Sequence, residues 1–290
     1  MVVLHDHGAW FTIGQEKMAC PAWRDDLDSI SNLRLQAESR AWVDRCYSGI
    51  YVADSLAKEG FVVLVTDALY WGRRRVEPGA EQTPPSLCDT SSNSEEELKK
   101  FNKALQKAQP AFYEQHLQET GEAWFETILR EDIESVDYLC SLPFVDTTKI
   151  FCFGFSMGAY RSWQLAAADP RIAGCAAANW MTTIRYTGGF ITGSSSWAMY
   201  RPVPEGADST DYDYPMIASH ISPRPFLLLY GTKDHVIPAA GTKMAIRTIR
   251  RQYKGRQFRT VAFPADHVFT LEHYQTLLHW LKSHSVTRNR

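Results

Sequence analysis

The segment KIFCFGFSMGAY, residues 149–160, contains the pattern that decides the fold. An apolar run leads into the pentapeptide GFSMG at 154–158, and a helical pattern of small and apolar residues follows it. A GxSxG pentapeptide alone would occur by chance in roughly one chain of this size in ten. A strand before it and a helix after it place a serine at a sharp, exposed apex, where only glycine lets neighbouring backbone approach. The segment therefore predicts Ser156 as a nucleophile.

Further apolar runs on both sides of this segment alternate with helical patterns. We expect strands at 2–5, 61–66, 149–153, 174–179, 225–230 and 258–263, and helices at 41–59, 121–141, 157–169, 239–253 and 270–283. The strands are continuously apolar, as strands that helices cover on both faces should be. The alternation predicts a single α/β domain over residues 1–290, with one mostly parallel, doubly wound sheet of about six strands.

Two segments interrupt this rhythm. Residues 71–121 include PGAEQTPPS, TSSNSEEELKK and a polar helical run, which together predict a surface excursion with one exposed helix. Residues 181–222 are rich in Gly, Ser, Tyr and Pro. Long irregular segments in compact domains usually form lids or binding loops, so the second segment is expected to cover a site.

A nucleophilic serine needs a histidine base, and the histidine needs a carboxylate to hold its tautomer. Asp234 follows the strand at 225–230 and His267 follows the strand at 258–263, in the chain order that the GxSxG setting requires. Both lie where parallel sheets bind their ligands. Asp234 could instead cap a helix, and Asp266 could be the acid if it folded back from its place beside His267. His235, next to Asp234, could be a loop residue.

Acyl transfer also needs donors for the developing oxyanion, each worth about 2.7 to 4 kcal/mol. The backbone N–H of Met157 follows the nucleophile, and that of Ala9 lies in the turn after the first strand. His5 and His7, two apart on an extended segment, could instead ligate a metal, but no third ligand of matched spacing is evident. We therefore expect no metal and no cofactor.

Charge and composition exclude several classes of protein. The chain has 31 basic and 33 acidic side chains, a net charge of −2, which gives no field to attract nucleic acid or an anionic membrane. No apolar stretch approaches the roughly 18 residues of a membrane span, and the first residues lack a signal-peptide pattern. Six cysteines without a CxxC pair are typical of buried thiols. As written, the chain is expected to be cytoplasmic.

Five motifs resemble those of the α/β-hydrolase superfamily, specifically its dienelactone-hydrolase-like and acetyl-xylan-esterase-like serine esterases. They are HDHGA at 5–9, TDALYWG at 66–72, FGFSMGAY at 153–160, LLYGTKDHVIP at 228–238 and ADHVF at 265–269. The resemblance implies the α/β-hydrolase fold and a triad of Ser156, Asp234 and His267. Dienelactone hydrolases proper have Cys at the nucleophile position, so their lactone substrate is not implied.

The start of the chain departs from the resemblance. Such hydrolases begin with two further strands before the one that carries the oxyanion turn, whereas here that strand begins at residue 2. The chain is therefore expected to lack the first two strands of the fold, which leaves the strand at 61–66 at an edge of the sheet. If the start is truncated, a periplasmic or secreted location is also open.

Aromatic residues gather after the predicted strand ends and in the irregular segment. Among them Trp10, Trp71 and Trp180, together with His7, are candidate substrate contacts. Aromatic faces stack on sugar or aryl rings, which favours a small-molecule or carbohydrate ester, with acetyl as the acyl group, over a long acyl chain. The sequence thus predicts a serine carboxylic-ester hydrolase. A prolyl-oligopeptidase-like peptidase and a non-catalytic binding protein on the same fold are the alternatives.

Overall fold

The computed structural model describes residues 1–76, 95–186, 212–253, 255 and 257–285. In this part of the chain six strands form one sheet, ordered β2-β1-β3-β4-β5-β6, and every neighbouring pair is parallel. The strands are β1 (Val2–Leu4), β2 (Leu64–Val65), β3 (Ile150–Phe155), β4 (Ile172–Ala178), β5 (Phe226–Gly231) and β6 (Phe258–Phe263). The expected parallel α/β sheet is confirmed, and β2 lies at an edge as expected, although it is shorter than 61–66.

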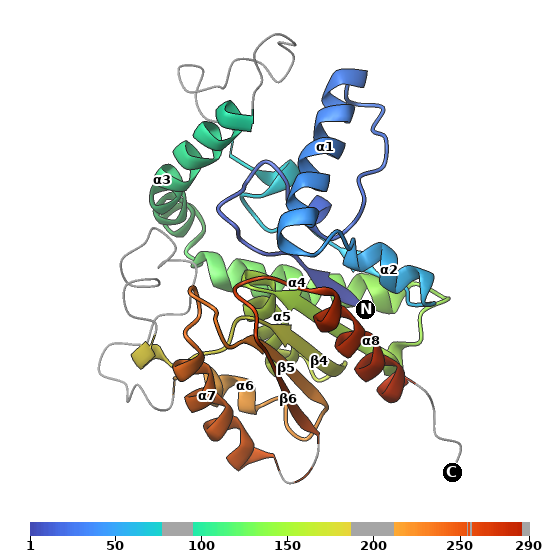
Figure 1. Cartoon of the computed structure of the whole chain (residues 1–290), viewed down its shortest axis with the longest axis vertical. Helices are drawn as coiled ribbons and strands as arrows, with labels where there is room; N and C mark the ends of the chain where they lie inside the picture. The colour runs from blue at the N-terminus through green and yellow to red at the C-terminus, as the bar shows by residue number, and fades with distance from the viewer. Residues whose placement is uncertain (77–94, 187–211, 254, 256, 286–290) are drawn as a thin grey trace.

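Helices cover both faces of the sheet (Figure 1). They are α1 (Ser29–Cys46), α2 (Val52–Lys58), α3 (Glu95–Thr120), α4 (Trp124–Ser141), α5 (Met157–Ala168), α6 (Tyr214–Ser219), α7 (Ala239–Gln252) and α8 (Leu271–Ser285). The single helix expected over 41–59 is instead the end of α1 and the whole of α2. Ser48 and Gly49 separate them, because their φ angles of 53° and 77° are left-handed and end the helical path.

The core has two halves, one on each face of the sheet. Val2 and Leu4 of β1 pack on the side of α4, α5 and α7, whereas Val3 packs on the side of α1, α2 and α8. Successive side chains of a strand point to opposite faces, so a strand with helices on both faces must be apolar throughout. This arrangement explains the uninterrupted apolar runs of the sequence.

Helix α3 differs from the exposed helix expected in residues 71–121. It buries Asn102, Leu105, Gln109 and Tyr113 along one face. Asn102 Oδ1 accepts the backbone N–H of Phe11 at 2.5 Å, so the helix packs on the loop that follows β1. The expectation of an exposed helix is therefore wrong for this face of α3. Two of the four buried side chains, Asn102 and Gln109, are amides, so the periodicity of apolar residues in the sequence does not reveal a buried face.

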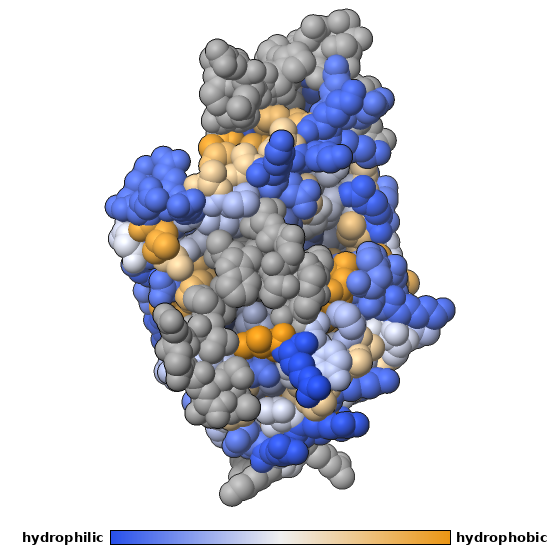
Figure 2. All heavy atoms as spheres, turned by 90° about the vertical axis from the view of Figure 1, so that its left-hand side faces the viewer, coloured by the Kyte–Doolittle hydropathy of each residue, from blue (hydrophilic) through white to orange (hydrophobic). Residues whose placement is uncertain are grey.

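The surface of the described residues is mixed in character. Figure 2 shows apolar side chains in several separate areas among hydrophilic ones, and Trp23, Leu33 and Phe144 are among the exposed apolar residues. Single exposed apolar residues are ordinary in folded proteins. Within the described ranges no helix is both long and apolar enough to cross a membrane.

Candidate active site

Ser156 stands at the turn between β3 and α5, in a conformation that its neighbours impose. Its φ and ψ are 55° and −121°, a left-handed backbone that L residues rarely adopt. A Cβ on Gly154 would lie 2.0 Å from the carbonyl oxygen of Gly158, and one on Gly158 would lie 1.9 Å from that of Leu4. Both positions therefore require glycine, and the close approach that they allow holds the serine at the apex.

The structure brings Ser156, His267 and Asp234 into one hydrogen-bonded chain. Ser156 Oγ lies 2.9 Å from His267 Nε2, and His267 Nδ1 lies 2.8 Å from Asp234 Oδ2. Both distances are those of ordinary hydrogen bonds. The three side chains come from the carboxyl ends of β3, β5 and β6, where the parallel strands meet one edge of the sheet. The arrangement can deprotonate the serine through the histidine while the carboxylate orients the ring.

The Asp234 carboxylate is almost fully buried and is held by four donors. Its Oδ1 accepts the backbone N–H groups of Val236 and Ile237, both at 2.8 Å. Its Oδ2 accepts the Asn179 amide at 3.1 Å in addition to His267. Donors of this number compensate a carboxylate for its lost hydration. Asp234 does cap a turn, as the alternative interpretation suggested, but the same side chain also contacts His267.

Asn179 is a site residue that the sequence reasoning missed. It follows β4 with a left-handed φ of 56°, and its amide reaches both Asp234 and the carbonyl oxygen of Asp266, at 3.3 Å. Its position at the carboxyl end of a central strand is the signal that could have identified it.

Asp266 and His235, the competing residues, pair with each other away from the serine. Asp266 Oδ1 accepts the backbone N–H of His267 at 2.7 Å and lies 2.5 Å from His235 Nδ1. The His235 hydrogen bond is the main reason why the pKa of Asp266 falls to about 2. Both side chains are more than half exposed. Asp266 thus supports the loop that carries His267 and does not contact its ring.

The two expected oxyanion donors differ in the structure. Met157 is the first residue of α5, so its N–H has no acceptor within the helix. The N–H of Ala9, in contrast, donates to Nδ1 of His7 at 2.8 Å. Ala9 therefore does not present a free donor, contrary to the sequence-based expectation.

The imidazoles of His5 and His7 are engaged within the protein. His5 Nε2 accepts the N–H of Ala68 at 3.0 Å, and His7 Nε2 lies 3.4 Å from Gln109 Oε1. Burial, more than any other factor, lowers the pKa of His7 to about 4, so the ring is neutral at pH 7. Among the described residues no group of three or more His, Cys, Asp or Glu is placed to hold a metal ion.

Two of the predicted substrate contacts are buried. Trp71 is 0% and Trp180 is 1% exposed. Trp71 donates its indole N–H to the carbonyl oxygen of His7 at 3.1 Å, and Trp180 packs on Tyr160 with ring centroids 4.8 Å apart. Trp10 remains half-buried beside the loop. The prediction of an accessible substrate contact is thus wrong for Trp71 and Trp180, which pack against large aromatic neighbours in the core.

One predicted feature, the irregular segment at 181–222, falls partly outside the described residues. The segment expected to be a lid, 181–222, is described only at its two ends, and its residues 187–211 lie outside the described residues.

Comparison with known proteins assigns the chain to a family of hydrolases. Residues 47–277, well over half of the chain, match the dienelactone hydrolase family. The chain belongs to the dienelactone hydrolase family. It is also 28% identical over 138 residues to the putative hydrolase YtaP of Bacillus subtilis (strain 168), a match that covers 47% of this chain and 45% of that protein. The chain thus aligns with less than half of this curated relative. The family match and this relative together support the conclusion that the protein is a hydrolase.

Solved structures resemble the fold across nearly the whole chain. A glucuronoyl esterase from Solibacter usitatus has a TM-score of 0.53 at 12% identity, covering 98% of this chain and 74% of its own. Methylesterase BT1017 has a TM-score of 0.54 at 15% identity, covering 97% of this chain and 48% of its own. At such low identity these likenesses speak for the fold alone, which is that of the α/β-hydrolases.

Proposed function

We propose that the protein is a serine carboxylic-ester hydrolase that works through an acyl-enzyme. The observation that carries the proposal is the continuous chain from Ser156 Oγ through His267 to Asp234, with distances of 2.9 and 2.8 Å. The strained backbone of Ser156 supports it, because residues held at such φ and ψ values cluster at active sites.

Each triad residue has one role in the proposed reaction. Ser156 Oγ attacks the ester carbonyl carbon as its proton passes to Nε2 of His267. The histidine then gives this proton to the departing alcohol, which leaves an acyl group on the serine. A water molecule, deprotonated by the same nitrogen, attacks the acyl-enzyme and releases the acid. Asp234 keeps the ring oriented and balances its charge while it holds the proton.

The proposed substrates are small acyl esters, such as acetyl, of a carbohydrate or a small aryl or alkyl alcohol. Trp10 lies half-buried in the loop after β1, where its ring also contacts Trp42 and Arg45. It is the one candidate tryptophan that is not fully buried, and because indole faces stack on sugars and aryl groups it favours an alcohol with a ring. Purified protein should be tested with p-nitrophenyl acetate, longer acyl esters, acetylated xylan and a Pro-p-nitroanilide peptide. Hydrolysis of the peptide alone would indicate a peptidase instead.

Replacing the nucleophile tests the proposal directly. Ser156→Ala is expected to lower kcat for the ester by about 10⁴-fold or more, because the acyl-enzyme can no longer form. Ser162→Ala, within the helix α5 that follows the turn, is the matched control, since its hydroxyl donates to the carbonyl oxygens of Ala159 and Ala176. This control should keep kcat within a few fold. Ester hydrolysis by Ser156→Ala above a few per cent of the wild-type rate would refute the assignment.

A further inference from the structure

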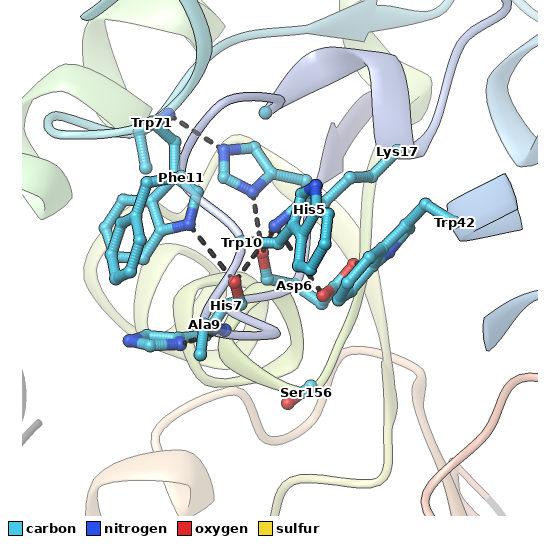
Figure 3. Close-up of polar contacts among 12 residues, drawn as sticks. His5, Asp6, His7, Ala9, Trp10, Phe11, Lys17, Trp42, Trp71 and Ser156 are labelled. Atoms are coloured by element: carbon cyan, nitrogen blue, oxygen red, sulfur yellow. Dashed lines mark hydrogen bonds and ion pairs between the residues drawn. The ribbon is translucent and has the colours of Figure 1, made fainter. Parts of the chain in front are cut away.

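The carbonyl group of His7, in the turn after β1, is held by several donors. Lys17 Nζ donates to its oxygen at 2.9 Å, Trp71 Nε1 at 3.1 Å and the backbone N–H of Trp10 at 3.3 Å. Lys17 Nζ also donates to the carbonyl oxygen of Asp6 at 3.1 Å (Figure 3). Two consecutive peptide groups are thus fixed from one side by the same ammonium group.

Lys17 is fully buried, and an acidic side chain and an aromatic ring lie beside its ammonium group. Its exposed fraction is 0%, the Asp6 carboxylate lies 3.8 Å away, and the Trp42 ring centroid lies 4.8 Å away. The Trp42 indole N–H and the Tyr47 hydroxyl donate to the same carboxylate, at 3.2 and 2.6 Å. Apolar side chains can often replace a buried ion pair without loss of stability, so folding alone gives little reason for this ammonium.

The direction of the His7 carbonyl fixes the direction of the next N–H group. In a trans peptide the C=O and the following N–H point in opposite directions. In Figure 3 Lys17 and Trp71 lie on one side of the loop and Ser156 on the other. The N–H of Gly8 is therefore directed away from the side on which Lys17 and Trp71 bind the His7 carbonyl oxygen. Gly8 is exposed, whereas the N–H of Ala9 is already bonded to His7.

We propose that the N–H of Gly8 is the second oxyanion donor, beside that of Met157, and that Lys17 and Trp71 are the residues that position it. This inference rests on the proposed ester hydrolysis and names a part of its machinery. Lys17 also strengthens the donor, because a cation on the carbonyl oxygen polarises the peptide group and makes its N–H a better donor. In the tetrahedral intermediate the negative oxygen then accepts hydrogen bonds from Gly8 and Met157.

The test replaces Lys17 with a neutral side chain of similar length. Lys17→Met should lower kcat for p-nitrophenyl acetate by about 100-fold, the loss typical of a missing oxyanion donor, with KM within twofold. Affinity for a trifluoromethyl ketone, which forms a stable oxyanion on the serine, should fall by the same factor as kcat/KM. Ser39→Ala is the matched control, because its hydroxyl bonds the neighbouring carbonyl of Glu16 without touching the loop after β1. It should leave kcat and inhibitor affinity within twofold.

A second variant keeps the test decisive if Lys17→Met does not fold. Trp71→Phe keeps an aromatic ring but removes the indole donor from the His7 carbonyl, and it should lower kcat and inhibitor affinity together by about tenfold. A folded Lys17→Met or Trp71→Phe with kcat within twofold of wild type overturns the inference while ester hydrolysis itself stands. If wild-type protein hydrolyses none of the esters, the proposed function fails instead, so the two failures are distinguishable.

Discussion

Asn179 connects three parts of the candidate site through one residue. Its backbone N–H donates to Leu229 of β5 at 2.9 Å, while its amide reaches Asp234 and the carbonyl of Asp266. Its backbone has a left-handed φ of 56° at this position. We infer that Asn179 positions the carboxylate that in turn orients His267.

Removing this amide should therefore reduce turnover more than binding. Asn179→Ala is expected to lower kcat by about 10- to 100-fold, because a hydrogen bond to a charged group contributes about 1.5–3 kcal/mol, and to change KM little. The kinetics should be measured beside circular dichroism of the folded protein. Asn32→Ala, which removes a buried amide at the start of α1, is a control that loses stability but should retain kcat. Equal kcat values for Asn179→Ala and wild type would contradict the positioning role.

At the scale of elements, α3 acts as a support for the loop after β1. Asn102 Oδ1 accepts the N–H groups of Phe11 and Thr12, at 2.5 and 3.3 Å, and two turns later Gln109 lies against His7. The helix belongs to the segment that interrupts the strand and helix alternation, yet its buried amides contact the loop that flanks Ser156.

The free energy of unfolding should depend on the contact between Asn102 of α3 and the loop after β1. Asn102→Ala leaves the Phe11 N–H buried without its acceptor, which is expected to lower the free energy of unfolding by about 1–3 kcal/mol in urea titrations. Lys103→Ala, on the exposed face of the same helix, should change it by no more than about 0.5 kcal/mol. Equal stabilities of the two variants would mean that α3 does not dock on this loop in solution.

At the scale of the whole molecule, histidines whose pKa is lowered by burial contribute to the response to acid. Burial lowers the pKa of His7 and His273 to about 4 and that of His5 well below 6.5. The unfolded chain, with histidine pKa values near 6.5, takes up these protons first, so stability falls as the pH falls from about 6.5 to about 4. Glu38 acts in the opposite direction, since burial raises its pKa to about 6, and it offsets part of the loss.

One substitution measures the contribution of a single histidine, His273, to this loss of stability at low pH. His273→Asn should reduce the loss of stability between pH 7 and pH 4 by up to about 3 kcal/mol, because the unfolded state then gains one proton fewer. His279→Asn, an exposed position on the same helix, should leave the pH dependence as in wild type. Chemical denaturation of the three proteins at several pH values measures the difference. Parallel curves for His273→Asn and wild type would show that His273 is not buried neutral.

The sequence by itself predicted the parallel sheet and the turn at Ser156, and it indicated Asp234 and His267 as the favoured partners of the serine while Asp266 stayed open as the acid. These depend on local signals: continuous apolar runs, two glycines around a serine, and polar residues directly after strands. In a parallel sheet the carboxyl ends of neighbouring strands meet at one edge, so residues that directly follow predicted strands could be expected at that edge.

Only the tertiary structure decided what surrounds them. His7 accepts the N–H of Ala9 and lies against Gln109, which is 102 residues away in the chain. Lys17 donates a hydrogen bond to the carbonyl oxygen of His7. Trp71 is buried in the core, although its place after a strand suggested a substrate contact. The contacts of His7 and Lys17 and the burial of Trp71 all depend on packing and hydrogen bonds between residues far apart in the chain. Such contacts leave no periodic pattern in the sequence, because a buried amide or ammonium looks like a surface residue until its partners are known.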